Sequence, residues 1–186
     1  MINTKNNVIA LIGESGSGKS TIATVLAKKY DYQKIISYTT RPPRKNEING
    51  IDYHFISEEK FKELKSNNFF AETGKYRNWF YGSSVYDYKK DKMIAALTPH
   101  GLRQVKRFKD LNVISFYINI PRRDRLIKIL QRGDDIEECY RRNLSDIGQF
   151  DGVADEVDYV IHNKNYIKTP EEIADEIIEN LASAFS

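Results

Sequence analysis

Residues 13–20 constrain the fold of this chain more than any other segment does. They read Gly-Glu-Ser-Gly-Ser-Gly-Lys-Ser and fit the pattern G-x-x-x-x-G-K-[ST]. An apolar run over residues 8–12 precedes them, and Ile22, Val25 and Leu26 follow at helical spacing. The segment is therefore typical of a buried strand, a glycine-rich turn and a helix that begins at the turn.

The residue types of this turn suit a phosphate ligand. Glycine lets successive backbone N–H groups converge on one anion, and the N-terminal end of the helix adds its dipole. Lys19 would reach the β- and γ-phosphates of ATP, and the Ser20 hydroxyl would ligate Mg²⁺. We expect Glu14 to point to solvent, because an acid beside a polyphosphate repels it. The expected ATP-binding residues of the loop are Gly13, Ser15, Gly16, Ser17, Gly18, Lys19, Ser20 and Thr21.

Segments of strand-like and helix-like pattern alternate along the chain. The expected strands cover residues 8–12, 34–40, 52–56, 93–97, 113–120 and 159–161, with short strands and loops over 68–90. The expected helices cover residues 21–30, 101–109, 122–131 and 137–149, and two more begin at caps at Ser57 and Thr169. This alternation predicts an α/β fold, a three-layer parallel sheet with helices on both faces of the kind found in P-loop NTPases.

Composition excludes several other classes of protein. The chain has 186 residues, enough for one domain, and its net charge of 29 − 26 = +3 gives no support for a nucleic-acid partner. A single cysteine, Cys139, excludes an internal disulfide, and the three histidines lack zinc-site spacing. No apolar run approaches the ~18 residues of a membrane span. We expect a cytoplasmic protein without a membrane partner, and a monomer or a homodimer.

A second motif lies in residues 37–55, which read Ser-Tyr-Thr-Thr-Arg-Pro-Pro-Arg-Lys-Asn-Glu-Ile-Asn-Gly-Ile-Asp-Tyr-His-Phe. Arg41 and Arg44 are three residues apart and are separated by prolines, which suits a rigid fork for a phosphate monoester. A solvated basic turn has the same composition. The residues alone leave both interpretations open.

Residues 37–55 resemble the guanylate kinase signature S-x-T-T-R-x-x-R-x-x-E-x-x-G-x-D-Y-x-F at every fixed position. The resemblance continues at Glu72, nine residues before Tyr81-Gly82-Ser83-Ser84. Residues 132–138 are similar to the lid motif R-G-x-x-x-E-E of that family, and residues 158–163 to its strand motif D-Y-x-I-x-N. The likeness therefore covers almost the entire chain.

This resemblance implies transfer of the γ-phosphoryl group of ATP to GMP or dGMP, with Mg²⁺ as the metal. It implies a core of about 1–40, 93–131 and 151–186, an acceptor-binding insert of about 41–92 and a lid of about 132–150. Glu72 would read the guanine edge, with Ser37 and Ser83 beside the base. The acceptor phosphate would bind Arg41, Arg44, Tyr53 and Tyr81. Lid cations Arg132, Lys128 and Arg142 would assist Lys19 and Arg41 in catalysis, and Asn163 would lie near the base of ATP.

The sequence departs from the family pattern in two places. The family motif D-x-D-x-x-G reads Ala96-Leu97-Thr98-Pro99-His100-Gly101 here, so altered support for Mg²⁺ and acceptor is expected, with Thr98 still at the acceptor. In the lid, strict spacing places Asn143 where the family has arginine. A shift of one residue in this alignment would let Arg142 take the role of that arginine.

Three functions stay open on this basis: a GMP kinase, a related kinase for another nucleotide or a sugar phosphate, and a degraded binding module. Of the remaining residues, Cys139 is interpreted as a spectator and 122–125 as a solvated helix face.

Overall fold

The computed structural model describes residues 7–44, 46–131, 133 and 136–184. Its larger sheet has five parallel strands in the order β2-β7-β1-β8-β9. Their bounds are β1 Asn7–Ile12, β2 Gln33–Lys34, β7 Met93–Leu97, β8 Asn112–Asn119 and β9 Tyr159–His162. Because successive side chains of a strand point to opposite faces, β1 serves two cores. Ile9 and Leu11 pack on one side, and Val8, Ala10 and Ile12 on the other.

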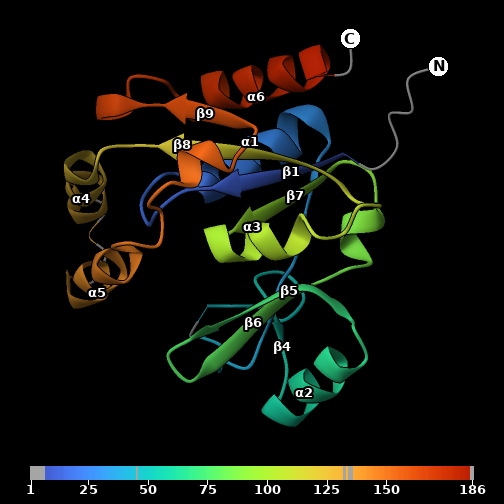
Figure 1. Cartoon of the computed structure of the whole chain (residues 1–186). Coiled ribbons are helices and arrows are strands. Elements are labelled where there is room, and N and C mark those ends of the chain that lie inside the picture. Colours follow the sequence, from blue (N-terminus) through green and yellow to red (C-terminus); the bar gives the residue numbers. More distant parts are fainter. Residues whose placement is uncertain (1–6, 45, 132, 134–135, 185–186) are drawn as a thin grey trace.

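Helices cover both faces of this sheet, as Figure 1 shows. Helices α1 (Lys19–Tyr30) and α6 (Pro170–Ala184) pack on the first face through Leu26 and Ile177. Helix α3 (Pro99–Val105) packs on the second face through Leu102. The predicted three-layer α/β fold is confirmed.

A second sheet of four strands lies below the first in Figure 1, in the order β4-β3-β6-β5. Its strands are β3 Tyr38–Thr39, β4 His54–Phe55, β5 Phe70–Tyr76 and β6 Trp79–Ser84. Helix α2 (Glu58–Ser66) packs on it through Phe61, whose ring stacks on those of Phe70 and Phe80. The division of the chain into core, insert and lid stays a prediction.

One predicted strand was wrong. Residues 34–40 do not form a continuous strand, because β2 pairs with β7 in the larger sheet while β3 pairs with β4 and β6 in the smaller one. The expected strand over 52–56 is also shorter than predicted and contains only His54 and Phe55. Residues 34–40 thus connect the two sheets, and a β-rich pattern does not reveal that change of partner.

Caps fix several helix starts. The Ser57 hydroxyl accepts a hydrogen bond from Lys60 N, and Thr169 and Glu172 form the predicted capping box. Helix α3 begins two residues earlier than predicted, since the Thr98 hydroxyl caps it and Pro99 occupies its first position.

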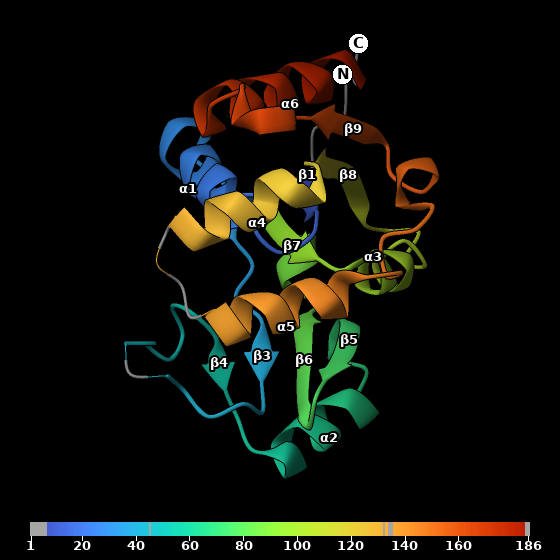
Figure 2. The ribbon, with the colours of Figure 1, turned by 90° about the vertical axis from the view of Figure 1, so that its left-hand side faces the viewer.

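The described residues also form the α-helices α4 (Arg122–Gln131) and α5 (Ile136–Asp146) and three short 3-10 helices, η1 (Asp87–Lys89), η2 (Val153–Asp155) and η3 (Lys164–Tyr166). Figure 2 shows α5 lying between α4 and the smaller sheet. Among the described residues, no helix is both long enough and apolar enough to cross a bilayer.

Candidate active site

The phosphate loop connects β1 to α1, as predicted. Gly16 and Gly18 have φ angles of 85° and 87°, a conformation that L side chains rarely adopt. At Gly16 there is also no room, because an added Cβ would lie 2.8 Å from Ile129 Cδ1 of α4. Backbone conformation therefore favours glycine at both positions, and at Gly16 the neighbouring helix α4 favours it as well.

A cavity of about 700 Å³ opens over this loop. The predicted ATP-binding residues 15–21 line it. Three other predicted site residues, which are distant from the loop in the sequence, line it as well: Lys128, Arg142 and Asn163. The lining residues that were not predicted as site residues include Ile129, Cys139, Tyr166, Lys168 and Thr169. Gly13 is not among the lining residues. It lies beneath the loop, where an added Cβ would lie 2.5 Å from Ser17 Oγ.

Lys19 is folded back on the loop. Its ammonium group donates to the carbonyl of Gly13, to that of Glu14 at 3.2 Å and to Ser17 Oγ at 3.4 Å. Burial lowers the pKa of Lys19 to about 8, and the nearby carboxylates of Asp146 and Glu14 partly oppose that effect. The donors that Lys19 would offer to a phosphate are thus satisfied internally in the protein alone.

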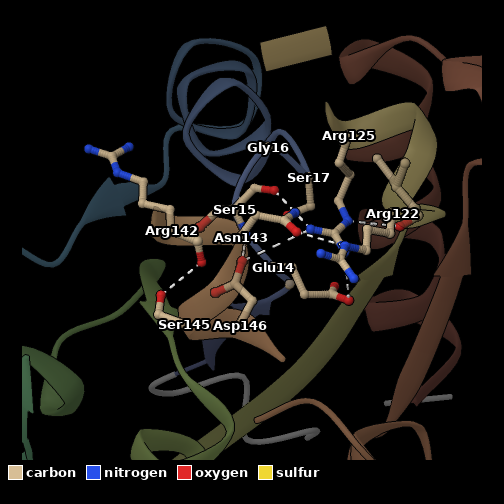
Figure 3. A network of polar contacts seen from close by, with 12 residues as sticks. Glu14, Ser15, Gly16, Ser17, Arg122, Arg125, Arg142, Asn143, Ser145 and Asp146 are labelled. Atoms are coloured by element: carbon tan, nitrogen blue, oxygen red, sulfur yellow. Dashed lines mark hydrogen bonds and ion pairs between the residues drawn. The ribbon is translucent and has the colours of Figure 1, made fainter. Parts of the chain in front are cut away.

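The expectation that Glu14 points to solvent is wrong. Its carboxylate accepts hydrogen bonds from Arg125 Nη2 at 3.3 Å and from the Tyr117 hydroxyl at 3.2 Å. The interpretation of residues 122–125 as a solvated face is also wrong for Arg125, which is 4% exposed. A buried guanidinium requires partners, and Arg125 has the carbonyls of Ile120 and Ser15 as well as Glu14. Figure 3 shows this network beside the loop.

Helix α5 brings a second acid to the loop. Asp146 Oδ2 accepts a hydrogen bond from Ser15 N at 2.8 Å and lies 4.0 Å from Arg125 Nη1. No motif of the sequence marks Asp146 or Arg125, so neither was predicted as a site residue. The signal that was available is the unusual acid Glu14 inside a phosphate loop, which requires a buried cation nearby.

The neighbouring residues Arg141 and Arg142 of α5 have different surroundings. Arg142 lines the cavity, whereas the Arg141 guanidinium lies 4.9 Å from the centre of the Tyr76 ring, over the smaller sheet. Asn143 is buried, and its Oδ1 accepts from Arg122 Nε at 2.7 Å. Arg132 lies outside the described residues.

The predicted base-reading residues form a hydrogen-bonded chain in the smaller sheet. The buried Ser83 hydroxyl donates to Glu72 Oε1 at 2.7 Å and lies 3.1 Å from the Ser37 hydroxyl. Burial raises the pKa of the Glu72 carboxyl, and its hydrogen bonds with Ser83 partly offset that effect. These three residues come from three strands or their ends, so only the folded sheet brings them together.

Helix α3 meets this chain at Gly101. A Cβ on Gly101 would lie 3.3 Å from Glu72 Oε2, so the helix approaches the carboxylate as closely as a glycine allows. Thr98 is near the same point, but its hydroxyl accepts from Gly101 N at 3.1 Å and caps α3. Ala96 is exposed and is the last residue but one of the neighbouring strand, β7, which ends at Leu97.

The predicted phosphate fork is ordered by an acid. Arg41 is 6% exposed, and its Nη2 donates to both carboxylate oxygens of Glu47, at 2.7 and 2.9 Å. Glu47 also accepts from Arg44 N at 2.7 Å, so it joins the two arginines of the motif. The Arg41 guanidinium lies 5.5 Å from the Tyr53 ring, and the rings of Tyr53 and Tyr81 are 6.1 Å apart. Arg41 is therefore not part of a solvated basic turn.

The last predicted donor-site residue, Asn163, is buried at the cavity wall. Its side chain exchanges two hydrogen bonds with the backbone of Lys168, at 3.0 and 2.9 Å. It thereby holds together the turn that carries Tyr166, whose hydroxyl donates to Gly16 O at 2.7 Å. Cys139 is buried and lines the same cavity. Its interpretation as a spectator stays a prediction.

A parallel sheet, a phosphate loop at the end of its central strand and a second sheet with a polar cluster define a P-loop nucleotide kinase. A model of the guanylate kinase family matches residues 5–181. The chain belongs to the guanylate kinase family, which confirms the resemblance inferred from its motifs.

Individual proteins agree with this assignment. Guanylate kinase from Rickettsia prowazekii (strain Madrid E) is 32% identical over 190 residues, covering 98% of this chain and 95% of the relative. Guanylate kinase from Histophilus somni (strain 129Pt) is 32% identical over 172 residues, covering 87% and 82%. The crystal structure of guanylate kinase from Anaplasma phagocytophilum has a TM-score of 0.70 at 26% identity and covers 100% of this chain and 89% of that one.

Proposed function

We propose that this chain is a guanylate kinase enzyme that transfers the γ-phosphoryl group of ATP to GMP and releases ADP and GDP. The observation that carries the proposal is the Glu72–Ser83–Ser37 chain, an acceptor array in a second sheet, apart from the phosphate loop. Guanine offers N1–H and N2–H₂ donors on one edge, and an ionised carboxylate accepts from both. A base without that edge would offer Glu72 neither of these donors, so such a base would bind weakly.

The reaction requires alignment and charge neutralisation rather than a covalent intermediate. The bond between the γ-phosphorus and the oxygen that bridges it to the β-phosphate breaks, and that oxygen leaves with ADP. An oxygen of the GMP phosphate forms the new bond to phosphorus. Lys19 and the loop N–H groups would hold the donor phosphates, and Arg41 and Arg44, with Tyr53 and Tyr81, would hold the acceptor phosphate. Arg142 and Lys128, on the cavity wall, would offset charge at the transferring group.

Mg²⁺ fits this site as an ion that arrives with the nucleotide. Ser20 is exposed at the cavity wall, and the described residues contain no group of three acidic, histidine or cysteine side chains that could hold a metal ion. The Ser20 hydroxyl and the ATP phosphates would bind the ion, which would supply positive charge to the phosphates. Glu14 is not a substitute carboxylate, because it is engaged with Arg125 and Tyr117.

The position of Ala96 gives a direct test of metal support. Ala96→Asp restores the first carboxylate of the family motif at the exposed end of β7. Since a lost supporting group costs about 10–100-fold in metal affinity or activity, this variant should reach half-maximal rate at a lower Mg²⁺ concentration. An unchanged Mg²⁺ titration would mean that position 96 does not support the metal.

A coupled assay of ADP release tests the activity itself. The purified chain with ATP and Mg²⁺ should turn over with GMP and dGMP, and far less with AMP, UMP, dTMP or a ribose bisphosphate. Preference for one of the other acceptors would replace GMP by that substrate class. No transfer to any acceptor would favour a binding module. A monomer or homodimer and a cytoplasmic location stay predictions.

A further inference from the structure

One donor of the phosphate loop is already bound to an anion of the protein itself. The backbone N–H of Ser15 donates to Asp146 Oδ2 at 2.8 Å. Ser15 belongs to the loop and lines its cavity, while Asp146 is the last residue of α5, 131 positions along the chain. Backbone N–H groups of a loop of this kind are the donors that a nucleotide's phosphate oxygens use.

The carboxylate of Asp146 is also close to the other cations of the loop. It lies 4.0 Å from Arg125 Nη1, and its charge is the largest one acting to stabilise the protonated form of Lys19. The Asp146 side chain is 16% exposed, so solvent screens these interactions only partly. A single carboxylate thus accepts from a loop N–H and lies near the cations Arg125 and Lys19, the kinds of group that would bind a phosphate.

We propose that Asp146 is an internal competitor of ATP: its carboxylate holds α5 on the phosphate loop and leaves Ser15 N when the phosphates bind. The proposal rests on the proposed function only in taking ATP as the ligand of the loop. Two anions on one N–H donor repel each other, so a phosphate oxygen that binds Ser15 N would compete with the Asp146 carboxylate.

Arg125 gives the displaced carboxylate an alternative partner. Its guanidinium is anchored by the carbonyls of Ile120 and Ser15, at 3.0 and 3.1 Å, and therefore stays in place when the lid helix shifts. A small rotation of Asp146 from Ser15 N towards Arg125 Nη1 would keep the acid paired. The same step would release α5 from its hydrogen bond to the loop, so that binding of ATP is coupled to the position of Arg142 on that helix.

Calorimetric titration of ATP, without acceptor, into four proteins tests the competition. The proteins are wild type, Asp146→Ala, Asp146→Asn and Asp151→Asn. Asp151 is exposed and five positions beyond Asp146, so its variant matches the loss of one negative charge near the end of α5. Removing one competing hydrogen bond should tighten ATP binding of Asp146→Ala by about 3- to 10-fold. The Asp146→Asn variant should fall between Ala and wild type, and Asp151→Asn should match wild type.

Inorganic tripolyphosphate serves as a second probe. It should gain as much affinity as ATP in Asp146→Ala, because the competition concerns the phosphates and not the nucleoside. Unchanged or weaker binding of both probes by a folded Asp146→Ala protein would overturn the proposal while leaving the ATP site intact. Failure of wild type to bind ATP would instead remove the proposed function, and the competition with it. A gain in affinity cannot come from partial unfolding, which only weakens binding.

Discussion

The phosphate loop and the smaller sheet are the two regions proposed to bind substrate, ATP at the loop and GMP at the sheet, but they are built differently. The loop is eight consecutive residues that present backbone N–H groups, and its conformation follows from glycines at Gly16 and Gly18. The proposed acceptor site uses side chains from separate elements, with Glu72 on β5, Ser83 on β6 and Arg41 after β3. A site made of consecutive residues depends mainly on its own segment, whereas a site assembled from separate strands depends on the position of each strand.

The two regions also differ in how their charges are satisfied in the protein alone. In the loop, Lys19 bonds to backbone carbonyls and to Ser17, and Ser15 N bonds to Asp146. In the smaller sheet, Arg41 pairs with Glu47 of its own motif. The partner of the loop N–H comes from a helix distant in sequence, whereas the partner of Arg41 is only six positions away. We therefore expect changes in the two regions to separate donor binding from acceptor binding.

The largest effect is expected at Lys19. Lys19→Ala should reduce the rate of phosphoryl transfer by about 10²–10³-fold, because the charge that holds the donor phosphates in the transition state is lost. GMP affinity and the fold should be nearly unchanged. Steady-state kinetics and GMP calorimetry would measure both, with Lys28→Ala on the exposed side of α1 as the control. Loss of GMP affinity in Lys19→Ala would show that the two sites are not independent.

The second prediction concerns the base. Glu72→Gln keeps the shape of the side chain and loses its charge and one acceptor oxygen. Since hydrogen bonds to charged groups are worth about 1.5–3 kcal/mol, GMP binding should weaken by roughly 10- to 150-fold while ATP binding stays the same. Glu63→Gln, at an exposed position of α2, is the control. Equal GMP affinity in Glu72→Gln and wild type would show that Glu72 does not read the base.

The pH dependence of GMP binding should reflect the ionisation of Glu72. Burial raises the pKa of Glu72, so its neutral form persists to higher pH than in an exposed glutamate. The neutral carboxyl accepts less well from N1–H and N2–H₂, and GMP affinity should therefore fall on acidification. The phosphate of GMP titrates as well, so the comparison is with Glu72→Gln, whose affinity should change less over the same range. Parallel curves for the two proteins would contradict the assignment.

The smallest effect is expected at the contact between α3 and the acceptor chain. In Gly101→Ala the new Cβ would lie 3.3 Å from Glu72 Oε2, so the carboxylate must shift by a few tenths of an ångström. GMP affinity should fall about fivefold, equivalent to about 1 kcal/mol. Alanine is favoured over glycine within a helix by about 1 kcal/mol, so thermal stability should hold or rise. Reduced stability with unchanged GMP affinity would mean that the backbone, not Glu72, yields to the methyl group.

Much of the fold was predictable because its signals are local. The apolar run before the phosphate loop and the helix cap at Thr169 each involve neighbouring residues, and the structure confirms them. The strand predicted over 34–40 was wrong because its residues pair with different sheets. Pairing partners lie far away in sequence, and residue pattern alone does not identify them.

The sequence by itself determined the phosphate loop and the family, since glycine, lysine and arginine stand at the fixed spacings of their motifs. It also predicted the residue types of the proposed acceptor site. Only the tertiary structure decided which of those groups have partners. Glu14 and Arg125 are 111 residues apart and form a buried pair, and Asp146 reaches Ser15 from another helix. Burial removes water as the alternative partner of a charge, so the position of each acid depends on which cation the fold places beside it.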